Sequence, residues 1–350
     1  MNSHLQSAVI SVSVTVVAVG IAMAFVLAVL AMMGHAPTTV MSMWLEGSAG
    51  NGTRLAMSLQ AAGPLLFTGL AAAVAFRCGV WNIGGEGQFL LGAVTMVACG
   101  TVMIPPGPAW CALPIAFLFA FAVASSWALL ATVAERWRGA PIVLTTILLN
   151  FIAVAVVSML VEGPLHDPNT TAPQTASMVE HLRLPVLVDG TKLHLGVIIG
   201  ILGAIGLFIL ARWTTIGFEV RVVGLNPRAA AVVGIPVWSR QVMVMAVSGG
   251  LAGLGGAMQV SGVTGMLSGT SVSYGYAGIA VAMLGRLHPL GIIAAALFMG
   301  MLSTGARHLE GRLGIPRDIG DVVQGVVVIA VLVGSMLATQ RFMRPAAEPT

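Results

Sequence analysis

The amino-acid sequence predicts an all-α fold, a polytopic transmembrane helical bundle of about ten spans with broken helices. Of its 350 residues, 57% are hydrophobic and only 8% are charged, whereas a soluble domain carries about 25% charged residues. The mean hydropathy of +0.97 agrees with that imbalance. One membrane helix needs about 20 apolar residues, so the whole chain, 1–350, fits a single membrane domain. Most soluble enzyme folds are excluded.

The first predicted span lies between Ala8 and Met33, in an apolar run interrupted only by small residues. A secretory signal peptide has a basic region before an apolar core of about 7 to 15 residues. This run is longer, and His4 is the only ionisable side chain before it. We therefore interpret it as a retained span.

The further spans are predicted from uncharged apolar runs that end at charge, proline or glycine. They are expected at about 55–76, 86–104, 109–134, 141–161, 195–211, 241–262, 274–285, 290–306 and 319–339. The third span ends at the prolines of 105–108. Two polar stretches interrupt the series, an outer loop at about 162–194 and an inner loop at about 212–240.

The arginines predict the orientation, because cytoplasmic loops are enriched in Lys and Arg. With both termini inside, ten of the sixteen basic residues fall on the inner side: Arg77, Arg136, Arg138, Arg212, Arg221, Arg228, Arg240, Arg286, Arg341 and Arg344. The N- and C-termini are therefore expected in the cytoplasm.

Glycine and proline predict the broken helices. The chain has 43 glycines and 17 prolines, and a broken helix is tolerated at membrane depth only where it is buried or lines a cavity. Glycine-rich interruptions occur at 79–92 and 262–285. The pairs Gly249/Gly253 and Ala252/Gly256 favour close helix packing.

The segment 77–89 holds the first group of candidate functional residues. Asn82, Glu86 and Gln88 lie among four glycines between two apolar runs, which predicts an unwound stretch followed by a helix start. Such broken helices frame many transport sites, and intramembrane ionisable groups are often functional. The alternative is structural: Glu86 caps a helix or pairs with Arg77.

Three more residues are candidates for the substrate pathway. Tyr274 and Tyr276 are the only tyrosines, in a glycine-rich segment that precedes Arg286. They are equally consistent with interfacial anchors. Asn150 is an amide inside a span, where a hydrogen bond between helices is the main alternative to substrate contact.

The inner loop contains a short predicted helix. Asn226 and Pro227 are typical of a helix start, and Gly234 followed by Pro236 ends it. A compact helix of about seven residues could be bound by a partner subunit. A simple solvated connector is also consistent with the pattern.

Catalysis and resident cofactors are not predicted. The only lysine, Lys192, has no P-loop around it, so ATP is not bound by that route. The outer-loop residues His166, His181 and His194 match no zinc motif, and three cysteines form no CxxC pair. We expect no metal, no cofactor and no enzyme activity. The scattered arginines also argue against nucleic-acid binding.

Three segments together resemble the permease subunits of bacterial ABC importers, in the nucleoside/simple-sugar branch that works with basic-membrane-protein-type lipoproteins. The first is Asn82-Ile83-Gly84-Gly85-Glu86-Gly87-Gln88-Phe89. The second runs from Gly224 to Ile235, and the third from Gly278 to Gly291. The likeness extends over about 55–335, with the segments in the family's order. Arg77-Cys78 and Gly85 depart from the family pattern and leave the substrate open.

The resemblance implies a multi-pass protein of the bacterial plasma (inner) membrane that imports nucleosides or related small polar solutes. A second permease, identical or paralogous, two cytoplasmic ATP-binding subunits and an extracytoplasmic substrate-binding protein are the implied partners. The implied ATPase-coupling residues are Gly224, Leu225, Asn226, Pro227, Arg228, Ala229, Ala230, Gly234 and Ile235.

Two other functions remain open at this stage. A ribose-like sugar permease belongs to the same class. An ion-coupled secondary transporter or channel would need no ATPase, but Glu86 is the only embedded acid that suits a proton relay. An intramembrane enzyme is disfavoured because no catalytic pair is apparent.

Overall fold

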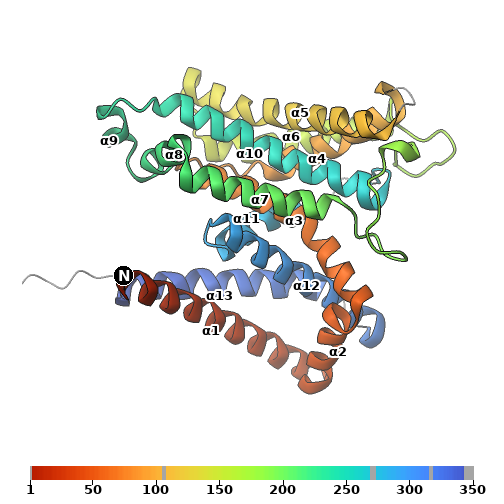
Figure 1. Cartoon of the computed structure of the whole chain (residues 1–350). Coiled ribbons are helices and arrows are strands. Elements are labelled where there is room, and N and C mark those ends of the chain that lie inside the picture. Colours follow the sequence, from red (N-terminus) through yellow and green to blue (C-terminus); the bar gives the residue numbers. More distant parts are fainter. Residues whose placement is uncertain (1, 105–107, 269–272, 315–317, 343–350) are drawn as a thin grey trace, which may run out of the picture. The chain divides into compact units, whose positions relative to one another are not determined.

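A computed structural model describes residues 2–104, 108–268, 273–314 and 318–342 (Figure 1). Within these ranges the chain is helical, and its β-pairing is limited to isolated bridges. The predicted all-α class is confirmed. The prolines of 105–107, residues 269–272 of the second interruption, and Arg344 with the C-terminus lie outside the described residues.

Helices occupy each position at which the sequence predicts a span. In the N-terminal half they are α1 (Asn2–Met32), α2 (Pro37–Ala49), α3 (Gly52–Arg77), α4 (Gly85–Ala98), η1 (Cys99–Met103), α5 (Ala109–Arg138), α6 (Ile142–Glu162) and η2 (Glu180–Leu182). In the C-terminal half they are α7 (Gly196–Trp213), α8 (Thr215–Leu225), α9 (Pro227–Val232), α10 (Val237–Gln259), η3 (Val260–Thr264), α11 (Tyr274–Leu284), α12 (Pro289–Leu313) and α13 (Asp318–Phe342).

The described helices refine the expected count of about ten spans. Seven of them are long and apolar enough to cross a membrane, and the bent pair α1–α2, which turns by 120°, raises the number to eight. Helix α11 has 11 residues, and at about 1.5 Å per residue it is too short for about 30 Å of hydrocarbon. The eighth expected span, at 274–285, is therefore a half-helix, in line with the predicted broken helices.

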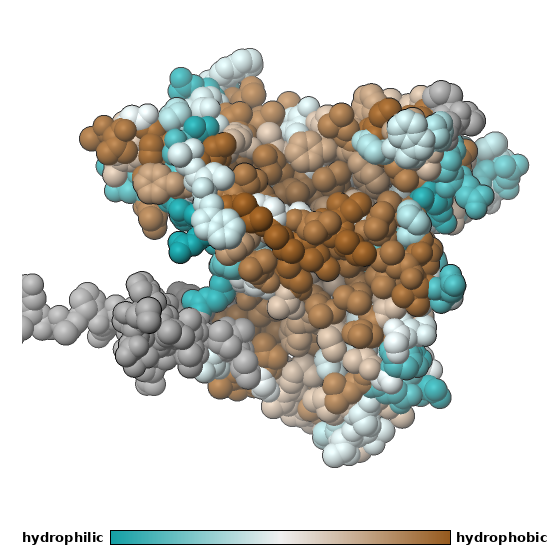
Figure 2. Space-filling model, in the orientation of Figure 1, coloured by the Kyte–Doolittle hydropathy of each residue, from teal (hydrophilic) through white to brown (hydrophobic). Residues whose placement is uncertain are grey.

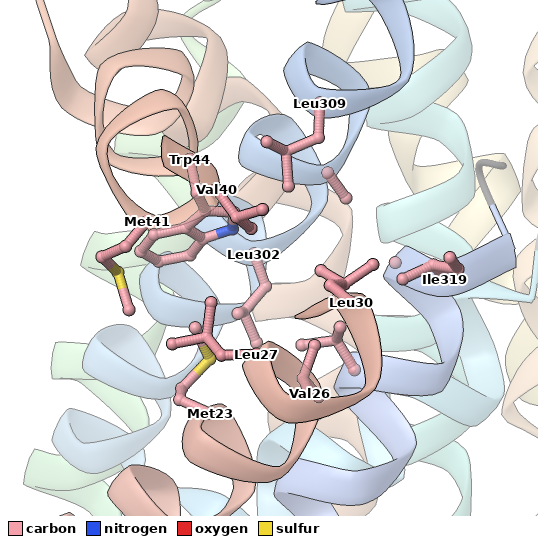
Figure 3. Close-up of a pocket in the computed structure, with 13 residues that line it drawn as sticks. Met23, Val26, Leu27, Leu30, Val40, Met41, Trp44, Leu302, Leu309 and Ile319 are labelled. Atoms are coloured by element: carbon pink, nitrogen blue, oxygen red, sulfur yellow. The ribbon is translucent and has the colours of Figure 1, made fainter. Parts of the chain in front are cut away.

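The chain divides into two compact units, which are described separately. One comprises Met1–Ser58 and Met299–Thr350, and the other Leu59–Phe298. The first unit contains α1, α2, α13 and the adjoining parts of α3 and α12. Figure 3 shows its small apolar pocket, where Leu27 and Leu30 of α1 and Trp44 of α2 surround a space of about 30 Å³.

The core of the second unit forms where α10 packs against α4 and α5. Helix α5 presents a stripe of buried alanines at every fourth position: Ala112, Ala116, Ala120, Ala124 and Ala128. Glycines of α10 face this stripe, and a Cβ on Gly253 would touch the Ala124 side chain. The backbone of α4 lies equally close, because a Cβ on Gly256 would overlap the Phe89 carbonyl oxygen. The predicted role of the small residues in helix packing is confirmed.

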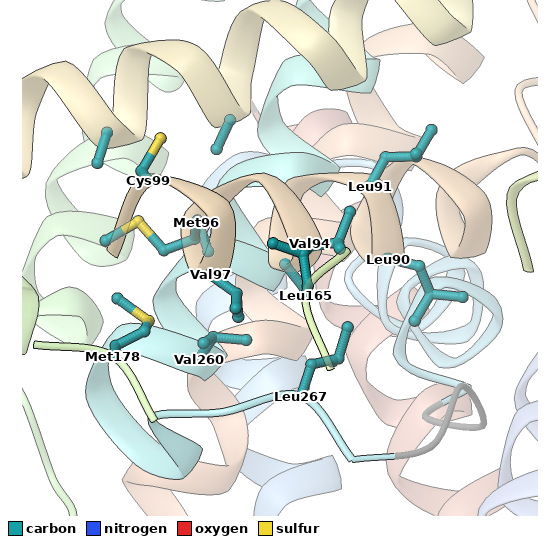
Figure 4. Close-up of a cluster of buried hydrophobic side chains, with 14 of the residues drawn as sticks. Leu90, Leu91, Val94, Met96, Val97, Cys99, Leu165, Met178, Val260 and Leu267 are labelled. Atoms are coloured by element: carbon teal, nitrogen blue, oxygen red, sulfur yellow. The ribbon is translucent and has the colours of Figure 1, made fainter. Parts of the chain in front are cut away.

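The outer loop, 162–194, is a structured cover for one end of the second unit. Its Leu165, Met178 and Leu182 join the buried side chains of α4 and η1 (Figure 4). Backbone hydrogen bonds join this loop to the segment after α10: Met178 N–H donates to the Gly265 carbonyl at 2.8 Å. Polarity alone predicted a loop here, and the apolar contacts explain why it is ordered.

The two polar loops lie at opposite ends of this unit. Helix α7 runs between them, with the outer loop before it and α8–α9 after it (Figure 1). Its outward face is apolar, with Leu202, Ile205 and Ile209 exposed, and forms part of the brown band in Figure 2. A helix with one apolar exposed side between two polar ends is what a bilayer requires.

Candidate functional site

The polar segment of the sequence is a loop between α3 and α4, as predicted. Helix α3 ends at Arg77, and Gly79 follows with a φ of +76°, the left-handed conformation that favours glycine at a helix C-terminus. The next helix begins at Gly85. Residues 78–84 are therefore unwound, and they bring Asn82 and Glu86 into the interior.

Asn82 and Gln88 form a reciprocal amide pair. Asn82 Nδ2 donates to Gln88 Oε1 at 3.0 Å, and Gln88 Nε2 donates back to Asn82 Oδ1 at 3.0 Å. Asn82 Nδ2 also reaches Ser248 Oγ of α10 at 2.9 Å, and that hydroxyl donates to the Ala71 carbonyl of α3 at 2.7 Å. Because all three side chains are buried, these bonds satisfy groups that water does not reach.

Asn150 ties the start of α4 to α6 and α11. Its Oδ1 accepts from Gly87 N–H at 2.9 Å, while its Nδ2 donates to the Ile83 carbonyl at 3.0 Å and to the Tyr276 hydroxyl at 3.1 Å. One turn earlier on α6, Thr146 Oγ1 accepts from Ile83 N–H at 3.3 Å. The hydrogen bond between helices expected of Asn150 is therefore present, and substrate contact by this residue stays a prediction.

Glu86 holds the N-termini of two helices together. It lies in the first turn of α4, and its carboxylate accepts backbone N–H bonds from Ser273 at 2.8 Å and Gly275 at 2.7 Å, at the start of α11. A helix N-terminus carries about half a positive charge, so one buried carboxylate stabilises both ends. The predicted capping of a helix N-terminus is therefore present, although the sequence did not indicate that Glu86 would reach α11, and a role of Glu86 in the substrate pathway stays a prediction.

The structure brings all six candidate pathway residues into one region. Asn82, Glu86, Gln88 and Asn150 are buried, and the Tyr274 ring lies 5.4 Å from the Phe89 ring. Tyr276 is 44% exposed. Sequence reasoning missed Ser248 and Thr146, whose hydroxyls complete the network. Thr146 sits four residues before Asn150, on the same helix face, and that spacing was the available signal.

The inner loop folds into the predicted helix. Asn226 Oδ1 accepts from the N–H groups of Arg228 at 3.0 Å and Ala229 at 3.1 Å, a side-chain cap of the expected type. Pro227 begins α9, and Gly234 follows it with a φ of +84°. Ala230 is the buried residue of α9.

Large apolar side chains point outward on α8 and α9. Leu225 is 86% exposed and Val232 is 87% exposed, and Val233 and Phe218 are also exposed. Beneath this surface, Glu219 of α8 pairs with Arg240 at the start of α10. Arg221 donates to the Ala211 carbonyl at the end of α7. These two contacts fix the helix pair α8–α9 to α10 and α7. The pair exposes apolar side chains on its other side, which is a feature of interaction sites.

The network and the inner loop meet at Gly224. A Cβ on this residue would overlap the Arg77 carbonyl oxygen, and a Cβ on Gly79 would lie 3.5 Å from Gly224 Cα. The C-terminal end of α8 thus packs backbone to backbone on the start of the unwound loop. This contact joins α8 directly to the loop that carries Asn82.

No group of three or more potential metal ligands occurs among the described residues. His166, His181 and His194 of the outer loop are not gathered at one point. His194 is buried beside Gly196, whose N–H donates to His194 Nδ1 at 3.1 Å, and burial lowers the pKa of the imidazole to about 4. Its role is in packing.

The sequence is similar to known proteins over most of its length. The family model described as "Branched-chain amino acid transport system / permease component" matches residues 54–332. The guanosine ABC transporter permease protein NupP of Bacillus subtilis is 33% identical, over 77% of this chain and 78% of that protein. The nucleoside ABC transporter permease protein NupB of Lactococcus lactis is 32% identical, over 81% and 80%. The glucose ABC transporter permease protein TsgB13 of Haloferax volcanii is 30% identical, over 79% and 76%.

Proposed function

This chain belongs to the family of branched-chain amino acid transport system permease components, and from that premise we propose that it imports nucleosides. The resemblance predicted from the three motifs is confirmed. The chain is a permease subunit of an ABC importer and a multi-pass protein of the plasma membrane. It is not an enzyme, because ATP is hydrolysed by separate ATP-binding subunits. A substrate-binding protein is the other partner.

The proposed assembly has two permeases, identical or paralogous, and two ATP-binding subunits. We assign the ATPase contact to the inner loop, 212–240, and the contact with the binding protein to the outer loop, 162–194. Leu225, Val232 and Val233 supply exposed apolar area of the kind found at the centre of protein interfaces. In this proposal the whole chain, 1–350, works as one permease domain.

The packing of Gly224 on Arg77 is the observation that carries the mechanism. Closure of the ATP-binding subunits would move α8–α9, and the contact passes that movement to the unwound loop. The loop in turn positions Asn82, Gln88 and Glu86 and the half-helix α11. Coupling through a rigid packed contact needs a two-state element, and the broken helices α4 and α11 supply it.

A nucleoside fits the chemistry of this region better than an ion does. The network consists of neutral amides and hydroxyls, and its one carboxylate, Glu86, already accepts two backbone N–H groups. Tyr276 presents an exposed ring with a hydroxyl, and aromatic faces stack well on nucleobases. The relatives named for guanosine and nucleosides support this choice.

A sugar remains the second candidate, because TsgB13 is named for glucose and is nearly as similar. Both solutes can be tested with the complete transporter in proteoliposomes loaded with ATP. We expect uptake of labelled guanosine, competed by other nucleosides and not by glucose. Glucose uptake without guanosine uptake would replace the substrate assignment.

The same vesicles test the ATP-driven class. With an ATP-binding subunit whose phosphate-binding lysine is replaced, uptake should stop. Uptake that persists, and that follows an imposed proton or sodium gradient, would contradict the importer mechanism and support the ion-coupled alternative.

A further inference from the structure

A second site, separate from the polar network, lies on the inner-loop side of the second unit. It is a cavity of about 210 Å³ between α3, α7, α8 and α10. Its walls are almost wholly apolar, and include Leu70, Val74, Leu207, Leu210, Val220 and Val247. A nucleoside needs several hydrogen-bond partners around its base and ribose, and such walls supply few, so the cavity is unsuited to the transported solute.

Two arginines line the same cavity. Arg77 ends α3 and Arg221 lies on α8, and both are half-buried. Within the described part of the chain, neither forms an ion pair; the pair nearby is Arg240 with Glu219. Arg221 donates to the Ala211 carbonyl, which leaves its charge uncompensated. Since both guanidinium groups line this one cavity, their like charges repel each other.

The positive potential extends to the adjoining loop. His288, which packs on Phe208 with ring centroids 5.4 Å apart, has a pKa lowered by burial and by the charge of Arg77. Like charges held together beside an apolar cavity are unfavourable unless an anion joins them. A ligand with a negative head and an apolar body would match both the arginines and the apolar walls.

The position of the cavity identifies the source of that ligand. Helix α7 contributes Leu207 and Leu210 to the cavity and exposes an apolar face that forms part of the brown band in Figure 2. The arginine bias places this end at the cytoplasmic leaflet, where anionic lipids attract basic groups. Basic pockets between membrane helices on that side bind lipid head groups.

We propose that this cavity binds one anionic phospholipid, with an acyl chain among the apolar walls and the phosphate between Arg77 and Arg221. The lipid stabilises the junction of α3 with α8, which is the junction that Gly224 forms. A zwitterionic lipid offers the same chains but no net negative charge, so it should bind more weakly. The site is independent of the transported solute.

Native mass spectrometry of the complete, delipidated transporter tests the proposal. Phosphatidylglycerol and phosphatidylcholine with identical chains are titrated separately. We expect one phosphatidylglycerol per permease at low lipid, with an affinity at least about fivefold above that for phosphatidylcholine. R77Q and R221Q should each reduce that preference by about fivefold, the effect of one basic residue near a headgroup. R212Q removes an exposed arginine at the same end and is the matched control.

A second variant, V220W, fills the cavity and keeps both arginines. It tests the site independently if R77Q or R221Q fails to fold. It should reduce binding of both lipids. Equal retention of the two lipids by the wild-type protein, or an equal loss in R212Q and R77Q, would overturn the proposal. Displacement of the lipid by glycerol 3-phosphate alone would show a site for free phosphate and would also overturn it.

Discussion

The polar network around α4 and the helix pair α8–α9 use their side chains in opposite ways. The network buries amides, hydroxyls and one carboxylate in the protein interior and supplies each with the bonds described above. Helices α8 and α9 expose Leu225 and Val232 to the surroundings. Buried polar groups that are fully hydrogen-bonded fix the positions of the helices that carry them. Exposed apolar side chains, in contrast, become stable when a partner protein covers them. The difference separates residues that position the chain from residues that recognise another subunit.

Gly224 is where the two regions meet, and its replacement should have the largest effect. In G224A the added Cβ overlaps the Arg77 carbonyl oxygen, so α8 must move away, which costs about 3 kcal/mol. We expect ATP-driven uptake to fall more than about tenfold. Gly203 of α7 has open space around it, so G203A is the matched control. Normal uptake by G224A would break the proposed link between the regions.

The Glu86 carboxylate is the next largest contribution. In E86Q one of the two backbone donors of α11 loses its acceptor, and the favourable interaction with two helix N-termini disappears. We expect the free energy of unfolding to fall by about 2 to 3 kcal/mol. Thermal unfolding in detergent measures it, and E46Q, at an exposed residue of α2, serves as control.

The uptake of the assembled E86Q transporter carries separate information. Impaired uptake at a temperature where the variant stays folded would add a transport role to the capping role. An unchanged melting temperature would contradict the capping role itself.

His194 sharpens the comparison, because it is a buried polar group outside the network. Its Nδ1 accepts one bond, but its Nε2 has no partner among the described residues. Its pKa is lowered from 6.5 to about 4, so the unfolded chain binds the proton more readily. Stability is complete above about pH 6.5 and falls as the pH decreases towards 4.

The expected loss from His194 at pH 5 is about 2 kcal/mol. It can be measured as the change in melting temperature between pH 7.5 and pH 5. In H194Q this pH dependence should be much smaller, because the titrating group is gone. The same pH dependence in both proteins would assign it to other residues.

The Asn82–Gln88 amide pair should contribute less to the free energy of unfolding than Gly224, Glu86 or His194. A double-mutant cycle measures its interaction energy. In N82L the Gln88 amide loses its partner, and in Q88L the Asn82 amide does. An unsatisfied buried amide costs about 1 to 3 kcal/mol. The double variant N82L/Q88L removes both, so its loss should be about 1 kcal/mol less than the sum of the single losses. Strict additivity would mean that the two amides do not interact.

Much of the second unit was predictable from local sequence signals. Runs of apolar residues placed the helices, Asn226 and Pro227 marked the start of α9, and Gly79 allowed the turn after α3. Partners distant in the sequence were not predictable. Glu86 bonds to Ser273 and Gly275, nearly 190 positions away, and Ser248 joins Asn82 across 166 positions. The position and length of α11 matched the short span expected at 274–285, but hydropathy did not show that a helix of this length fails to cross the membrane.

The exposed face of α8–α9 should show the smallest effect on stability. Leu225 and Val232 contact little within the chain, so L225S/V232S should change the free energy of unfolding by less than about 0.5 kcal/mol. Removal of their apolar area should still weaken the contact with the ATP-binding subunits, because apolar groups at an interface centre dominate its energy. Co-purification of those subunits measures this, with Leu202→Ser and Ile205→Ser on the exposed face of α7 as the matched pair. If the inner-loop variant retains its ATP-binding subunits as well as the wild-type protein does, these exposed side chains are not the partner surface. The two regions would then differ only in whether their side chains are buried.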